Sequence, residues 1–264
     1  MNKEKLLYEN SKHALQSDNI IAITNRHLCS RPFMEQLERV CKLHPHAIVL
    51  REKDMPEAEY LSLARDVIAL CKKYDVQCML HSFINVAMEL EHPYIHLPLP
   101  ILEAYVKKNV SGKISTGMSK STDNYQQFFK VIGTSVHSVE DAIKAEQLGA
   151  TYMTAGHIFA TDCKKGLPPR GLDFLKNVCD AVGIPVYAIG GINIASSCDS
   201  TTSDAQSTYD AMPDISVPRL ADVMKCGAAG GCIMSGMMRR CDLPTISQFL
   251  FFLQNILWFT AQCL

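Results

Sequence analysis

FFKVIGTSVHSVEDAIKAEQLGATYMTA, residues 128–155, contains one complete repeat of a fold in chain order. Residues 128–136 are an apolar run with the length and composition of a buried strand. The run Ser138-Val-Glu-Asp is a helix start signal, and Gly149 is a typical helix stop. Residues 151–155 then form a second apolar strand. Because two strands joined by a helix run parallel, this stretch predicts an α/β fold.

The same alternation recurs along the rest of the chain. The apolar runs expected to be strands are residues 19–24, 46–50, 77–80, 93–97, 128–136, 151–155, 185–189 and 231–234. Helices are expected at residues 32–43, from 55 onward, between 80 and 93, and at 138–149, 171–182, 216–226 and 244–261. Eight strands alternating with helices fit one closed (β/α)8 TIM barrel, which takes about 250 residues, and the chain has 264. The rival is an open doubly wound sheet, but its GxGxxG fingerprint is absent after the first strand.

The whole chain, residues 1–264, is therefore expected to be a single barrel domain with additions. Residues 1–18 form an N-terminal extension, and residues 109–124 and 195–213 are polar loop insertions. Because the second insertion follows the seventh strand, on the face where barrels carry their sites, it is either a lid over the pocket or a disordered insertion.

Charge and cysteine content narrow the class of protein. Lys and Arg number 26 against 27 Asp and Glu, a net charge of −1, so the chain is no polycationic nucleic-acid binder. The eleven cysteines form no CxxC pair, and residues 1–18 contain no apolar signal core. Scattered thiols of this kind predict a reducing compartment, and we expect the protein to be cytoplasmic.

Residues 244–264 form an unusually apolar C-terminal helix. They lack an apolar run of 18 residues, so we expect no membrane-spanning segment. One face carries the packing stripe of an eighth barrel helix, while Phe251, Phe252, Trp258 and Phe259 lie largely outside it. The helix is either only the last barrel helix or also the contact of a homo-oligomer.

Two turns predict a phosphate site. Gly190 and Gly191 follow the seventh strand, and Ser235 and Gly236 follow the eighth. Small residues there let backbone N–H groups and a helix start approach an anion, although glycine is also common in ordinary strand-to-helix turns.

Other strand ends supply chemically useful side chains. Arg51 and Lys53, two apart at the end of the second strand, are expected to point together into the barrel mouth and favour an anionic substrate, unless they belong to a solvated charge run. His137 ends the fifth strand, where an imidazole can exchange protons near neutral pH. The alternatives are that it caps the next helix or satisfies a contact in the core. The loop after the sixth strand carries Thr161 and Lys164 and could close over a charged ligand.

A metal site is not expected. His44 with His46, and His92 with His96, lack the spacing and the carboxylate of a common metal-ligand set. Paired acidic residues at strand ends, which a magnesium–diphosphate site needs, are missing.

Five runs in this order resemble the thiamine phosphate synthase/TenI superfamily across roughly residues 20–240. They are LREKD (50–54), SVHSVEDAIKAEQLGA (135–150), GHIFATDCKKGLPPRGL (156–172), PVYAIGGI (185–192) and IMSG (233–236). The GHIFATDCKKG loop followed by RGL looks more like the TenI thiazole tautomerases than the synthases. The resemblance implies a (β/α)8 barrel that binds a phosphorylated thiazole.

The resemblance also implies roles for particular residues. The histidine of the SVHS run, His137 here, is the acid/base residue of the tautomerase branch. The phosphate would lie on Gly190, Gly191, Ser235 and Gly236, and the positions that match anion-contacting synthase residues are Arg51, Lys53, Thr161 and Lys164.

The synthase branch carries magnesium-binding carboxylates where this chain has Ser82 and Ile101. The expected function is therefore a thiazole tautomerase that aromatises a carboxythiazole phosphate without a metal or cofactor. The alternatives are a Mg²⁺-dependent thiamine phosphate synthase and a non-catalytic, regulatory thiazole-phosphate binder.

Overall fold

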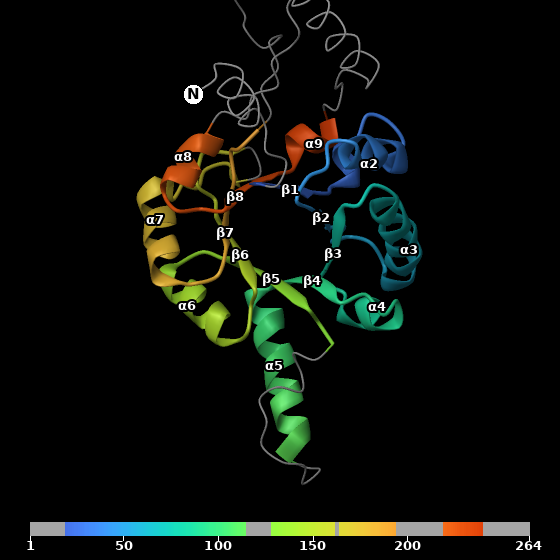
Figure 1. The fold of residues 1–264 in the computed structure, drawn as a ribbon, viewed down its shortest axis with the longest axis horizontal. Coiled ribbons are helices and arrows are strands. Elements are labelled where there is room, and N and C mark those ends of the chain that lie inside the picture. The colour runs from blue at the N-terminus through green and yellow to red at the C-terminus, as the bar shows by residue number, and fades with distance from the viewer. Residues whose placement is uncertain (1–18, 115–127, 162–163, 194–218, 240–264) are drawn as a thin grey trace, which may run out of the picture.

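The computed structural model describes residues 19–114, 128–161, 164–193 and 219–239. Eight parallel strands close into a barrel in chain order, and helices surround it (Figure 1). The strands are β1 (Ile20–Ile23), β2 (Ala47–Leu50), β3 (Gln77–His81), β4 (Tyr94–Pro98), β5 (Val131–Val136), β6 (Tyr152–Gly156), β7 (Val186–Ile189) and β8 (Gly230–Ile233). The predicted TIM barrel is confirmed.

Closure follows from the pairing of the first strand with the last. Ile21 in β1 is in register with Ala47 of β2 on one side and with Cys232 of β8 on the other, and both pairs are parallel. An open doubly wound sheet would leave β1 or β8 with a free edge, so the rival topology is excluded.

The strands are apolar along their length because both of their faces are covered. In β1, Ile21 and Ile23 belong to a cluster inside the barrel, whereas Ile20 and Ala22 belong to the larger cluster between strands and helices. Successive side chains of a strand point to opposite faces, which gives one chain segment two buried surfaces.

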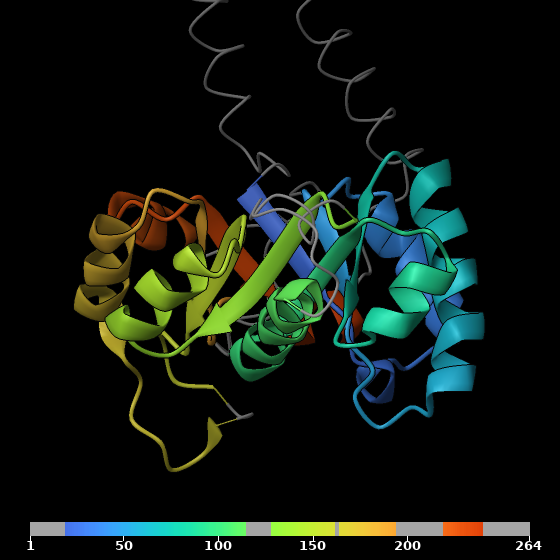
Figure 2. The ribbon, with the colours of Figure 1, turned by 90° about the horizontal axis from the view of Figure 1, so that it is seen from below.

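The helices lie outside the strands, as Figure 2 shows from the side. They are α2 (Phe33–Cys41), α3 (Glu57–Lys73), α4 (Ile84–Glu89), α5 (Leu99–Ile114), α6 (Val139–Gln147), α7 (Gly171–Ala181), α8 (Leu220–Lys225) and α9 (Ser235–Arg239), with a short 3₁₀ helix, η2, at Arg26–Leu28. None of these helices is long and apolar enough to cross a bilayer, within the residues described. The seven cysteines in the same ranges are free thiols.

The prediction that residues 109–124 form a loop is partly wrong. Helix α5 continues through residues 109–114, the beginning of the expected loop 109–124, and extends away from the barrel wall (Figure 1). Ser and Gly are weak helix formers, but extending an existing helix by such residues costs only about 0.5–1 kcal/mol each, so polar composition alone does not end a helix. The N-terminal extension, the rest of this insertion, residues 195–213 and the helix at 244–264 lie outside the described residues.

Candidate active site at the carboxyl ends of the strands

The two predicted glycine turns lie side by side. Ile189 of β7 pairs with Cys232 of β8, which brings the turn after β7 beside the start of α9. Gly190 has φ +100° and Gly191 has φ +71°, values that L side chains rarely adopt. A Cβ on Gly190 would lie 2.4 Å from the Cβ of His157, so the loop after β6 packs directly on this turn.

Backbone N–H groups are available at this position. Ser235 and Gly236 are the first residues of α9, and an α-helix leaves its first N–H groups without an intrahelical acceptor. Ser235 is half-buried and adds a hydroxyl group. The four residues predicted to hold a phosphate are thus brought together by the β7–β8 pairing.

Arg219 adds a cation that the sequence analysis missed. Its Nη1 donates a hydrogen bond to the carbonyl oxygen of Gly191 at 2.7 Å, and its guanidinium lies 4.6 Å from the ring centroid of Phe159. No sequence motif identified Arg219 as a site residue, because it follows a long polar segment without a recognisable pattern.

Three further cations act on one another at the same end of the barrel. The pKa of Lys53 is lowered, first by burial and then by the positive charges of Arg51 and Lys164. One expectation needs correction, since β2 ends at Leu50 and Arg51 and Lys53 follow the strand rather than belong to it. Arg51 is half-buried, and Lys53 is the more exposed of the two. Their shared repulsion still favours an anionic ligand.

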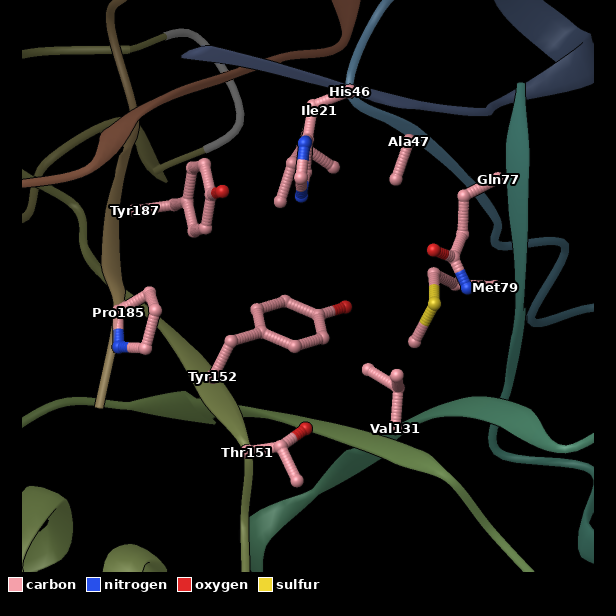
Figure 3. Close-up of a pocket in the computed structure, with 10 residues that line it drawn as sticks. All are labelled: Ile21, His46, Ala47, Gln77, Met79, Val131, Thr151, Tyr152, Pro185 and Tyr187. Carbon is pink, nitrogen blue, oxygen red and sulfur yellow. The ribbon is translucent and has the colours of Figure 1, made fainter. Parts of the chain in front are cut away.

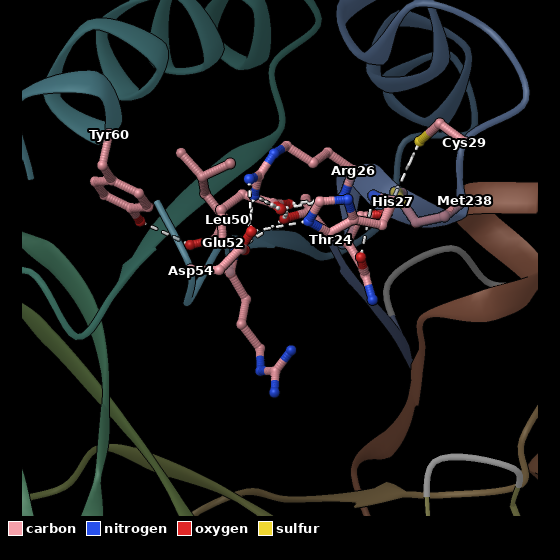
Figure 4. A network of polar contacts seen from close by, with 11 residues as sticks. Thr24, Arg26, His27, Cys29, Leu50, Glu52, Asp54, Tyr60 and Met238 are labelled. Atoms are coloured by element: carbon pink, nitrogen blue, oxygen red, sulfur yellow. Dashed lines mark hydrogen bonds and ion pairs between the residues drawn. The ribbon is translucent and has the colours of Figure 1, made fainter. Parts of the chain in front are cut away.

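The acidic residues of the REKD run have a separate structural role (Figure 4). Glu52 is only 2% exposed and accepts hydrogen bonds from Thr24 Oγ1 at 2.7 Å and from Arg26 Nη1 at 3.1 Å. Thr24 Oγ1 in turn accepts the backbone N–H of Arg51 at 2.8 Å. The buried carboxylate therefore fixes the backbone from which Arg51 extends.

Asp54 completes this network at the surface. Its two oxygens accept hydrogen bonds from Arg26 at 2.8 and 2.7 Å, and one also contacts His27 Nε2 at 2.9 Å. These contacts, first with Arg26 and then with His27, hold the pKa of the Asp54 carboxyl well below its usual range. Both carboxylates of the run are thus already engaged by cations.

His137 lies directly after β5 with one ring nitrogen fixed and the other available. Its Nδ1 is 2.8 Å from the carbonyl oxygen of Gly156, which can only accept, so in the neutral tautomer Nδ1 carries the proton and Nε2 has the lone pair. Ser138 caps α6 by accepting the N–H of Asp141 at 3.0 Å. The alternative that the His137 side chain caps this helix is therefore wrong, because Ser138 is the N-cap of α6.

A neutral polar layer lies inside the barrel at this end. The rings of His81 and His96 stack at 5.6 Å, and His96 contacts Ser135 Oγ and the Tyr152 hydroxyl, each at 2.9 Å. Burial lowers the pKa of His81 to about 2 and that of His96 to about 3, with further lowering by the charge of Arg51. Both imidazoles are uncharged at neutral pH.

The short spacing of His92 and His96 in the sequence suggested a pair, and the structure separates them. His92 Nε2 contacts the carbonyl oxygen of Cys78 at 2.8 Å, whereas His96 faces the barrel interior. The alternation of inward and outward side chains along a strand could have placed both histidines inside the barrel. His81 lies two residues after the inward Met79, and His96 lies two residues after the inward Tyr94.

The loop after β6 contributes Thr161 and Lys164 to the same end. Their backbones are joined by a hydrogen bond from Lys164 N–H to the Thr161 carbonyl at 3.0 Å. Lys164 is exposed and close enough to Lys53 to lower its pKa. Residues 162–163 of this loop are outside the described ranges.

The donor set does not fit the magnesium site of a synthase. Ser82, at one expected carboxylate position, contacts His81 Nδ1 at 2.8 Å, and Ile101, at the other, packs against the core. Across the part of the chain that the structure describes, no group of three or more His, Cys, Asp or Glu residues is arranged to hold a metal ion.

A closed parallel barrel with glycine turns, cations and a histidine at the carboxyl ends of its strands is typical of enzymes that act on phosphorylated small molecules. The family model described as thiamine monophosphate synthase (TMP-TENI) matches residues 20–209. The chain therefore belongs to the thiamine monophosphate synthase/TenI family.

Individual relatives agree with this assignment. The chain is 34% identical to a putative thiamine-phosphate synthase 2 of Aquifex aeolicus over 178 residues, which is 67% of this chain and 87% of the relative. It is 27% identical to thiamine-phosphate synthase 2 of Streptococcus pneumoniae over 237 residues, 89% of this chain and 95% of the relative. The solved structure of a thiamine phosphate pyrophosphorylase from Pyrococcus furiosus matches with a TM-score of 0.61 at 25% identity, covering 85% of this chain and 89% of that one.

Proposed function

We propose that this member of the thiamine-phosphate synthase family is a thiazole tautomerase, which aromatises a carboxythiazole phosphate in thiamine biosynthesis. The observation that carries the proposal is the geometry of His137. Its Nδ1–H donates to Gly156 O at 2.8 Å, which orients the ring and leaves the basic Nε2 free at the end of the barrel where anions are favoured. A positioned imidazole of this kind accelerates proton transfer by about 10²–10⁴-fold.

In the proposed reaction, the substrate phosphate lies on the turns after β7 and β8 and the substrate carboxylate near Arg51. His137 Nε2 takes a proton from one ring carbon, the electrons of that C–H bond move into the ring system, and the imidazolium returns the proton at the neighbouring position. The proton and electron counts balance without a co-reactant. Cations at fixed positions hold the substrate so that one base serves both steps.

A second candidate is thiamine phosphate synthase itself, and the names of the relatives favour it. Against it stand Ser82 and Ile101 at positions where the synthases carry carboxylates. A third candidate, a regulatory thiazole-phosphate binder, would use the same phosphate turns without needing His137.

One comparative assay separates the three. The purified chain is given the carboxythiazole phosphate tautomer without metal, and in parallel the aromatic thiazole phosphate with the pyrimidine diphosphate and Mg²⁺. Aromatisation in the first reaction and no thiamine phosphate in the second supports the tautomerase. Thiamine phosphate in the second supports the synthase, and binding without turnover in either supports the binder.

Variants make the assignment specific. H137N is expected to lower the aromatisation rate by about 10²–10⁴-fold with little change in thiazole phosphate affinity. H157N, which removes a second imidazole at the same end of the barrel, is the matched control and is expected to keep the rate. Undiminished isomerisation by H137N would contradict the proposed mechanism.

A further inference from the structure

A cavity of about 220 Å³ opens at the opposite end of the barrel from the candidate active site (Figure 3). His46, Thr151 and Pro185 each immediately precede a strand, and Gln77 and Val131 each begin one. All five lie at the amino ends of the strands, whereas the glycine turns, cations and His137 lie at the carboxyl ends. The cavity is therefore separate from the proposed tautomerase site.

The sequence creates this space with small residues on the strands. Gly133 of β5 is in register with Tyr152 of β6, and a Cβ on Gly133 would lie 2.1 Å from Cζ of that ring. Glycine at this position lets the tyrosine ring extend across the barrel interior. Ala47 on β2 lines the cavity with only a methyl group.

Aromatic rings form one side of the cavity. The rings of Tyr152 and Tyr187 meet edge to face at 6.0 Å, and His46 stacks on Tyr187 at 5.7 Å. Ile21 and Met79 supply apolar surface. Such walls favour a flat aromatic ring as a ligand, because edge-to-face and offset ring contacts add favourable free energy beyond that of burying apolar surface.

Two polar groups point into the cavity. Figure 3 shows the side-chain amide of Gln77 and the hydroxyl of Tyr187 directed toward the open space. Neither side chain makes a hydrogen bond within the described part of the chain. The Tyr152 hydroxyl, by contrast, is already bonded to His96 Nδ1 at 2.9 Å. A ligand that donates and accepts hydrogen bonds would satisfy the two open groups.

Charge distinguishes this cavity from the site at the other end. Its lining residues include no Lys, Arg, Asp or Glu, whereas three mutually repelling cations lie near the carboxyl ends. An ionised ligand would lose hydration here, and the imidazole of His46 is the one lining side chain that can carry a positive charge. The volume exceeds the roughly 150 Å³ known to admit benzene, which leaves room for one substituted ring.

We propose that this cavity is a second ligand site, which binds an uncharged, single-ring heteroaromatic molecule through ring contacts with Tyr152 and Tyr187 and hydrogen bonds to Gln77 and the Tyr187 hydroxyl. The proposal does not depend on the proposed tautomerase function.

The test uses nicotinamide and nicotinate as probes, because they share one shape and differ in charge at neutral pH. Their affinities for the full chain are measured by titration calorimetry and ligand-observed NMR. Nicotinamide is expected to bind in the cavity and nicotinate at least about tenfold more weakly there. Absence of nicotinamide binding to the parent chain would overturn the proposal.

Variants locate the binding. A47L fills the cavity and is expected to abolish nicotinamide binding, and Q77M, of similar size but without the amide, and Y187F are each expected to weaken it about three- to tenfold. K164A at the opposite end is the matched control and is expected to keep nicotinamide affinity while weakening binding of inorganic phosphate. Phosphate binding by A47L, Q77M and Y187F checks that each variant is folded. Binding that survives A47L, or that K164A removes, would place the probe elsewhere and refute the proposal.

Discussion

Acidification is expected to weaken this fold through the two stacked histidines inside the barrel. His81 and His96 are 6% and 3% exposed, and their pKa values in the folded chain are about 2 and about 3. In the unfolded chain both rings titrate near the ordinary value of about 6.5. Between these limits the unfolded chain binds protons that the folded chain does not, so the free energy of unfolding falls as the pH falls.

The magnitude follows from the distance to the unfolded pKa. At pH 5, which is 1.5 pH units below 6.5, each neutral histidine lowers the free energy of unfolding by about 2 kcal/mol, since one unit corresponds to about 1.4 kcal/mol. The two together give about 4 kcal/mol relative to pH 7. The pKa of His92 is also lowered by burial and adds in the same direction. Carboxylates with lowered pKa, such as Asp54, contribute only at pH values below about 5.

The measurement is urea unfolding followed by far-UV circular dichroism at pH 7.0, 6.0 and 5.0. The parent is expected to lose at least about 4 kcal/mol between pH 7 and pH 5, whereas H81N and H96N should each lose about 2 kcal/mol less than the parent. The difference between pH values is compared within each variant, so any loss of packing in the variant itself cancels. A pH dependence equal to the parent's in both variants would show that neither histidine is held neutral by the fold.

Three further substitutions test other parts of the structure. G190A places a Cβ 2.4 Å from that of His157 at φ +100° and is expected to weaken inorganic phosphate binding more than about tenfold. The control G166A, at φ +81° with nothing within 4 Å of the added Cβ, should retain phosphate binding. Both affinities are measured by calorimetry, and equal effects would refute a special role of the turn after β7. G133A, which drives a Cβ into the Tyr152 ring, should lower the free energy of unfolding by about 1–3 kcal/mol in urea titrations, and an unchanged midpoint would contradict the packing described. E52Q removes the charge that binds Arg26, although Arg26 keeps its contact with Asp54. The substitution should lower the free energy of unfolding by about 1.5–3 kcal/mol and raise the KM for the carboxythiazole phosphate. An unchanged KM would show that this network does not affect substrate binding.

Local sequence patterns were sufficient for the architecture. The strand–helix–strand pattern of residues 128–155 recurs because each strand is buried on both faces and each helix on one, and such burial leaves a period in the sequence. The Ser138 cap and the glycines after β7 were equally local, since caps and positive-φ turns depend on a few adjacent residues. The end of α5 was misplaced because residues 109–114 have a loop-like composition but continue an established helix.

The sequence by itself determined the barrel, the end of it that carries the candidate site, and the positions of His137 and of the turns that contain Gly190, Gly191, Ser235 and Gly236. Only the tertiary structure decided which side chains meet. His81 and His96 stack because β3 and β4 pair in register, and Lys164 reaches the neighbourhood of Lys53 from a different loop. The cavity at the amino ends exists because Gly133 lies opposite Tyr152 on the next strand. These contacts depend on strand register and on burial by distant segments, and a one-dimensional pattern records neither.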